Sequence, residues 1–89
     1  MLVKAQRIQV TGPHRLRVWF TDGSVGERDF EQELSRGGPM ALPLLDSAFF
    51  AKVFLDCGAP TWPNGYDMAP WALHKDMADE GLLRRTEPV

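Results

Sequence analysis

The sequence predicts a single α+β domain in which an antiparallel β-meander is accompanied by short helices and one C-terminal helix. Three observations predict this class. Segment 15–20 (RLRVWF) alternates polar and apolar residues, an Asp-Gly pair follows it at 22–23, and segment 71–80 has apolar residues at helical spacing. The 89 residues suffice for one domain, which we expect over residues 1–80, with a loose tail at 81–89.

Segment 15–20 predicts a strand with one buried face, because successive side chains of a strand point to opposite sides of the sheet. The side chains expected to face the core are Leu16, Val18 and Phe20. Those expected to face outward, or toward another element, are Arg15, Arg17 and Trp19. An outward tryptophan between two arginines is typical of an interface.

Two further strands are expected beside this one, at 3–10 and 25–30. A two-residue Asp22-Gly23 loop would place Val25 beside Phe20. Val25 and Phe30 are then an odd number of residues apart and cannot share a face of a regular strand. Either a bulge lies near Gly26, which we favour, or Phe30 already belongs to the next element.

The remaining elements are short, apart from the last helix. We expect a helical turn at 30–34 capped by Asp29, and a second short helix capped by Asp46. Segments 53–55 and 61–62 read as two returning strands. Pro70 suits the first position of a helix at 71–80, and Gly81 suits its end.

Composition limits the class of partner and the compartment. The net charge is −2, which argues against nonspecific binding to nucleic acid, so we expect no nucleic-acid partner. The single cysteine, Cys57, fits a reducing compartment, and no apolar stretch approaches the length of a signal peptide or a membrane span. We therefore expect a soluble cytoplasmic protein without a membrane association.

No constellation of catalytic or metal-binding residues is apparent. His14, His74 and Cys57 lack the spacing of a zinc site, and nothing near Cys57 in the sequence would lower the pKa of its thiol. No serine lies in a nucleophile elbow, and Gly37-Gly38 lacks the lysine and wider spacing of a phosphate loop. We expect no catalytic residue, no metal and no cofactor.

An aromatic cluster surrounds a Pro-Asn-Gly turn near the C-terminal helix. Its rings are Trp62, Tyr66 and Trp71, with Asp67 and His74 nearby in the sequence. They could line a groove that binds a peptide or a small ligand. In the alternative, they anchor the last helix to the sheet in a small core, which is the reading that we favour.

Three segments together resemble the DUF2442 family of small bacterial proteins of unknown function. They are segment 15–26 (RLRVWFTDGSVG) with Asp29-Phe30, Leu45-Asp46 with Phe49-Phe50 and Val53, and segment 62–70 (WPNGYDMAP) with Leu73. The resemblance covers residues 3–75. It implies a small α+β domain with a meander, and it supplies no catalytic residues.

The resemblance also implies a context. Members of the family are often encoded beside DUF4160 proteins, which suggests a toxin–antitoxin-like pair. A related domain precedes a helix-turn-helix domain in some longer proteins, and this sequence shows no such extension. The first hypothesis is therefore a noncatalytic protein-interaction module that acts as the antitoxin-like member of such a pair. It would bind a protein partner, or itself as a homodimer, through the face that carries Trp19, Arg15 and Arg17 or through a sheet edge. The alternative is a small-ligand-binding protein or minor enzyme using the Trp62, Tyr66 and Trp71 region.

Overall fold

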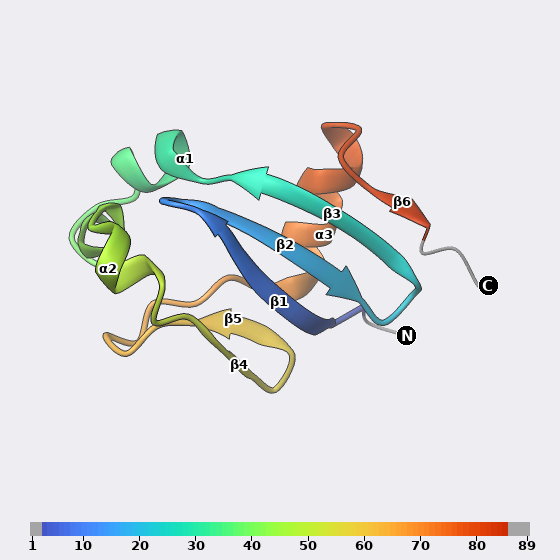
Figure 1. Ribbon diagram of the computed structural model, residues 1–89, viewed down its shortest axis with the longest axis horizontal. Coiled ribbons are helices and arrows are strands. Elements are labelled where there is room, and N and C mark those ends of the chain that lie inside the picture. The colour runs from blue at the N-terminus through green and yellow to red at the C-terminus, as the bar shows by residue number, and fades with distance from the viewer. Residues whose placement is uncertain (1–2, 86–89) are drawn as a thin grey trace.

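The computed structural model describes residues 3–85, which form a four-stranded sheet, a two-stranded sheet and short helices (Figure 1). The strands are β1 (Ala5–Gly12), β2 (Arg15–Phe20), β3 (Ser24–Asp29), β4 (Phe54–Asp56), β5 (Ala59–Thr61) and β6 (Arg84–Arg85). The helices are α1 (Glu31–Ser35), the 3₁₀ helix η1 (Leu42–Leu45), α2 (Ser47–Phe50) and α3 (Pro70–Asp79). The prediction of an α+β fold with an antiparallel meander and a C-terminal helix is confirmed.

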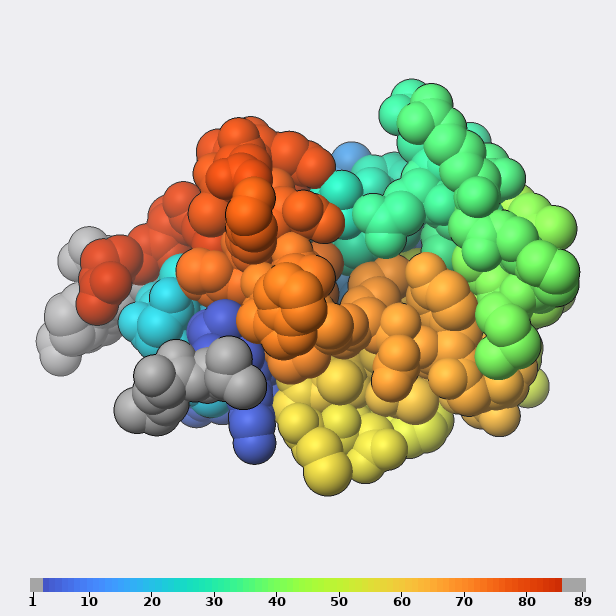
Figure 2. Space-filling view, turned by 180° about the vertical axis from the view of Figure 1, so that it is seen from behind, coloured from blue at the N-terminus to red at the C-terminus, as the bar shows by residue number. Residues whose placement is uncertain are grey.

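The meander is formed by β1, β2 and β3, which pair with one another in chain order. The core side chains of β2 are buried as predicted, since Leu16, Val18 and Phe20 are at most 1% exposed. No described element packs on the other face of the sheet, which is turned toward the viewer in Figure 1. We call this face the open face. Helix α3 covers the opposite face (Figure 2).

The register between β2 and β3 differs from the prediction. Val25 pairs with Trp19 rather than with Phe20, and the pairing is regular throughout, so the bulge that we favoured near Gly26 is absent from these strands. The loop has three residues because Gly23 adopts the left-handed conformation (φ 89°) and the Asp22 carboxylate accepts hydrogen bonds from the amide and hydroxyl of Ser24.

Phe30 is the N-cap residue of α1, so it lies at the start of the next element, as in the second alternative. It precedes α1 and is fully buried in the core. The prediction that Asp29 is the N-cap of this helix is wrong by one residue, because the N-cap position is Phe30. The Asp29 carboxylate still accepts a hydrogen bond from the amide of Glu31 (2.9 Å). Asp46 caps α2 as predicted, accepting from the amide of Ala48 (3.0 Å).

The three-residue loop places Gly26 on the core face, opposite Val18. A Cβ atom at Gly26 would lie 2.5 Å from the carbonyl oxygen of Leu82 and 2.9 Å from the Cε atom of Met77. The missing side chain therefore leaves the space into which the end of α3 and the residues after it pack.

Residues 81–85, which we expected in a loose tail, return to the sheet. Gly81 ends α3 in the left-handed conformation (φ 71°), Leu83 packs against the core, and Arg84 and Arg85 pair with β3 as β6. The structural domain thus includes these residues. The rest of the expected tail, 86–89, lies outside the described residues.

Strands β4 and β5 form a separate hairpin beside β1. Its turn consists of Cys57 and Gly58, both in the left-handed region (φ 52° and 81°). The carbonyl oxygen of Gly58 accepts a hydrogen bond from the amide of Ala5 at the start of β1 (2.9 Å), which joins the two sheets.

Candidate functional site

The first candidate site lies on the open face of the meander. Trp19, Arg17 and Arg15 all point to this face from β2, as the alternation predicted, and the cross-strand partners of the arginines on β3 are Glu27 and Asp29. Arg17 donates to Glu27 (Nη2 to Oε1, 2.9 Å), and Arg15 contacts the other oxygen of the same carboxylate (Nη1 to Oε2, 3.4 Å). The two arginines are thus held in place by acids of the neighbouring strand.

These hydrogen bonds favour the ionised form of Glu27. The hydrogen bond from Arg17 lowers the pKa of Glu27 below its usual value, with a smaller effect from Arg15. Glu27 is therefore charged at neutral pH, and it balances much of the positive charge of Arg15 and Arg17.

Trp19 has a further neighbour that the sequence analysis did not identify. Arg7 of β1 is the cross-strand partner of Trp19, and its guanidinium carbon lies 4.7 Å from the centroid of the indole ring. Arg17 lies over the same ring at 6.0 Å. The alternation of polar and apolar residues in β1 was the signal that could have placed Arg7 here. The expected strand at 3–10 had the right location, but its pairing with β2 was not worked out.

The predicted aromatic cluster does not form one groove. Trp62 is only 1% exposed, and its indole Nε1–H donates to the carbonyl oxygen of Phe50 (2.9 Å), so it belongs to the core. Tyr66 packs against Trp62 with ring centroids 5.9 Å apart. Trp71 is 57% exposed on α3 and has no aromatic neighbour among the described residues. The structure therefore brings two of the three rings together.

His74 lies apart from this cluster as well. Its Nε2 atom is 2.9 Å from a carboxylate oxygen of Asp22, and its ring packs edge-on against Phe20 with centroids 4.9 Å apart. Partial burial raises the pKa of Asp22, but hydrogen bonds from Ser24 and His74 outweigh it and hold this pKa below its usual value. His74 thus ties α3 to the loop between β2 and β3.

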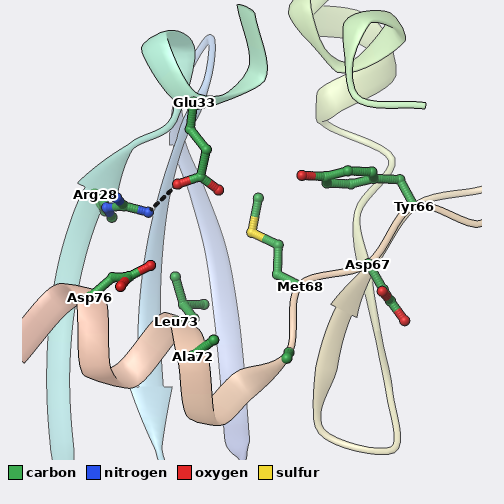
Figure 3. Close-up of a pocket in the computed structure, with 9 residues that line it drawn as sticks. Arg28, Glu33, Tyr66, Asp67, Met68, Ala72, Leu73 and Asp76 are labelled. Carbon is green, nitrogen blue, oxygen red and sulfur yellow. Dashed lines mark hydrogen bonds and ion pairs between the residues drawn. The ribbon is translucent and has the colours of Figure 1, made fainter. Parts of the chain in front are cut away.

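The second candidate site is a small hollow between α1, α3 and the loop that leads into α3 (Figure 3). Its volume is about 150 Å³, and its lining includes five polar or charged side chains. They are Arg28, Glu33, Tyr66, Asp67 and Asp76. Tyr66 and Asp67 were predicted site residues. Asp76 comes from the helix that follows them, whereas Arg28 and Glu33 come from elements distant in the sequence.

Two ion pairs organise the charged side of this hollow. Arg28 contacts Glu33 (Nη1 to Oε1, 2.8 Å) and, outside the lining, Glu80 (Nη2 to Oε2, 2.9 Å). Figure 3 shows Arg28, Glu33 and Asp76 on one side and the Tyr66 ring on the other. Burial, followed by the charges of Glu33 and Asp67, raises the pKa of Tyr66 above its usual value, so its hydroxyl keeps its proton.

Other kinds of site find no support among residues 3–85. No group of three or more His, Cys, Asp or Glu side chains in this range is arranged to hold a metal ion. No helix in the described part of the chain has the length and hydropathy to cross a membrane.

Comparison of the chain with protein-family models, with curated proteins and with solved structures finds no match. The resemblance to the DUF2442 family therefore stays a prediction. The class that the structure defines is a small α+β domain with one bare sheet face, and the function must be argued from its two candidate sites.

Proposed function

We propose that this protein is a noncatalytic interaction module that binds a protein partner through the open face of the sheet. The observation that carries the proposal is the position of Trp19, which is partly exposed on the inner strand β2, on a face that no described helix or loop covers. Large aromatic side chains on a soluble domain are usually buried by its own chain or by a partner.

The arginines around Trp19 strengthen this proposal. Arg15 and Arg17 are held by Glu27, so their side chains lose little further conformational freedom when a partner binds. Tryptophan and arginine are the residue types that most often dominate the binding energy of protein interfaces.

The experiment is a tagged pull-down from native lysate with two matched tryptophan variants. Trp19→Ala removes the proposed contact, and Trp71→Ala removes an equally large exposed side chain from the far side of the molecule. We expect Trp19→Ala to weaken capture of a stoichiometric partner by at least about 30-fold, the effect of losing an interface hot spot of about 2 kcal/mol. Trp71→Ala should retain the partner.

Light scattering on the purified protein separates a foreign partner from a second copy. A homodimer of the parent chain that becomes monomeric in Trp19→Ala would assign the face to self-association. Unchanged assembly and unchanged capture in Trp19→Ala would refute the proposed interface.

The resemblance described above supports a narrower version of this proposal. If the chain is a member of the DUF2442 family, its partner is expected to be a small bacterial protein encoded beside it, with this chain as the antitoxin-like member. Identification of the captured protein by mass spectrometry tests this version separately from the interface itself.

A second candidate function rests on the hollow beside Tyr66, and it corresponds to the ligand-binding alternative. Three carboxylates and one arginine line this hollow, so its charge favours a small cation with an apolar part that can contact Tyr66. A thermal-shift screen of small primary and quaternary amines tests it, with Asp76→Asn as the variant. Stabilisation of the parent chain that Asp76→Asn abolishes would support this candidate, and no stabilisation by any amine would contradict it.

A further inference from the structure

One row of side chains crosses all four strands on the open face. Arg7 of β1 pairs with Trp19 of β2, Trp19 pairs with Val25 of β3, and Val25 pairs with Arg84 of β6. Residues directly opposite one another in antiparallel strands share a face, so these four side chains form a continuous row. We call it the Trp19 row. Its centre is apolar, with Trp19 partly exposed and Val25 only 4% exposed, and each end carries a guanidinium group.

Among the described residues, no acidic group balances the charges of the Trp19 row, whereas the arginines in the neighbouring rows have acidic partners. Arg17 and Arg15, in the neighbouring rows, are paired with Glu27. Within residues 3–85, neither Arg7 nor Arg84 has an acidic group within ion-pair distance. The open face therefore has a positive charge at each end of this row and is close to neutral elsewhere.

A hollow adjoins one end of the row. It has a volume of about 330 Å³ and is lined by Gln6, Arg7, Trp19, Phe20 and Gly23. The indole ring thus offers an apolar wall beside the guanidinium group of Arg7, which suits a ligand that carries a carboxylate next to an apolar side chain.

We infer that the partner of the open face presents an acidic segment, whose carboxylates pair with Arg7 and Arg84 and whose apolar side chain covers Trp19. This inference rests on the proposed function and names the chemistry of the partner. Strands lie about 4.8 Å apart, so the Cα atoms of Arg7 and Arg84 are about 14 Å apart across three strand intervals. Two acids about four residues apart in an extended segment match this span.

The charge pattern favours a protein segment over single-stranded nucleic acid. Tryptophan and arginine also serve as a stacking platform for bases. However, a nucleic acid presents a phosphate at every nucleotide and needs cations along its whole path. The row beside the Trp19 row holds Arg17 already paired with Glu27, so it offers phosphates a neutralised pair and no further line of cations.

The test uses fluorescein-labelled decapeptides and fluorescence anisotropy at low ionic strength. The probe contains glutamates four residues apart on either side of a leucine, and its control has glutamine in place of each glutamate. We expect the glutamate peptide to bind and the glutamine peptide to bind at least tenfold more weakly. Arg7→Gln and Arg84→Gln should each weaken binding of the glutamate peptide about three- to fivefold, as expected for one exposed ion pair.

The matched control is Arg36→Gln, which makes the same change of charge at the exposed end of α1. It should bind the glutamate peptide as the parent chain does. Equal binding of both peptides, no binding of the glutamate peptide, or equal effects of all three arginine variants would overturn the inference. Tighter binding of a labelled single-stranded thymidine decamer than of the glutamate peptide would also overturn it, in favour of nucleic acid.

These failures are distinguishable from failure of the proposed function. If Trp19→Ala loses its partner from lysate while Arg7→Gln and Arg84→Gln retain it, the open face is an interface but its partner is not acidic. If Trp19→Ala retains its partner, the interface itself is refuted.

Discussion

Replacing Gly26 with alanine tests how the end of the chain packs against the sheet. The added Cβ atom would lie 2.5 Å from the carbonyl oxygen of Leu82, whereas ordinary van der Waals contact begins near 3.4 Å. The backbone after α3 must therefore move by about 0.9 Å, the difference between these two distances. A backbone carbonyl cannot rotate out of the way as a flexible side chain could.

The expected magnitude follows from two opposing effects. Overpacking a filled core costs about 1–3 kcal/mol. Alanine restricts the unfolded chain and returns about 0.4–1 kcal/mol. We expect Gly26→Ala to lower the free energy of unfolding by about 1–2 kcal/mol, which corresponds to a fall in Tm of about 5–15 °C for a domain of this size.

The assay is thermal and urea unfolding followed by tryptophan fluorescence, together with hydrogen exchange of the amides of residues 82–85. Gly26→Ala should accelerate exchange there. The control is Gly38→Ala, which adds a methyl group in open space at a left-handed residue (φ 82°) and should not affect these amides. Had the strand contained the bulge that we predicted near Gly26, the new methyl group could face solvent. Unchanged or increased stability of Gly26→Ala would therefore refute the register and the packing described here.

Three further predictions concern single side chains. The hydrogen bonds from Ser24 and His74 lower the folded-state pKa of Asp22, so the stability that this carboxylate contributes is present above its unfolded pKa near 3.8 and is lost as the pH falls through the folded value. Asp22→Asn should therefore flatten the acid limb of a Tm-against-pH curve below about pH 4. An acid limb parallel to that of the parent chain would contradict the hydrogen bonds from Ser24 and His74 to this carboxylate. Tyr66 is the one tyrosine in the sequence, so an ultraviolet absorbance titration reports its pKa alone. Glu33→Gln should lower the pKa of Tyr66 toward the usual value, because it removes one of the charges that raise it. An unchanged titration would contradict the effect of the Glu33 charge on Tyr66. Asp46→Ala should lower the free energy of unfolding, measured by urea unfolding, by about 1 kcal/mol because it removes the cap of α2. Asp46→Asn is the control, since asparagine keeps a capping oxygen. Equal stability of the two variants would argue against the cap.

The features that the sequence predicted well are those that depend on neighbours along the chain. Alternation in segment 15–20 predicted the strand and its two faces, and the turn residues predicted the hairpin. Pro70 and Gly81 predicted the ends of α3 to within one residue. Each of these signals acts over a few residues, so no knowledge of the tertiary structure was needed.

The errors had two sources, the hydrogen bonds within one turn and the packing of a distant segment. The loop at Asp22-Gly23 was expected to have two residues, but the hydrogen bonds of Asp22 to Ser24 favour three, and this shifts the register of β3 by one residue. The return of β6 to β3 could not be anticipated from two arginines alone. It depends on the space above Gly26, which exists only once the sheet and α3 are in place.

The residues of the candidate sites were likewise predicted partly correctly and partly not. The positions of Trp19, Arg15 and Arg17 on one face followed from alternation. The different positions of Trp62 and Trp71 were harder to predict, although helical spacing gave a clue. Trp71 lies two residues before the buried Leu73, which puts it on the opposite side of a helix, and this signal was not used.

Strand β3 has neighbours that come from opposite parts of the chain, and this has a consequence for the order of folding. Its pairing with β2 closes a short loop, whereas its pairing with β6 joins residues about 60 positions apart and carries a much larger entropic cost. We therefore expect the hairpin of β2 and β3 to form early and β6 to join last. By the same reasoning β6 detaches first when the native state opens, so the Trp19 row exists in full only while the sheet is complete, and any ligand that spans the row would slow this local opening.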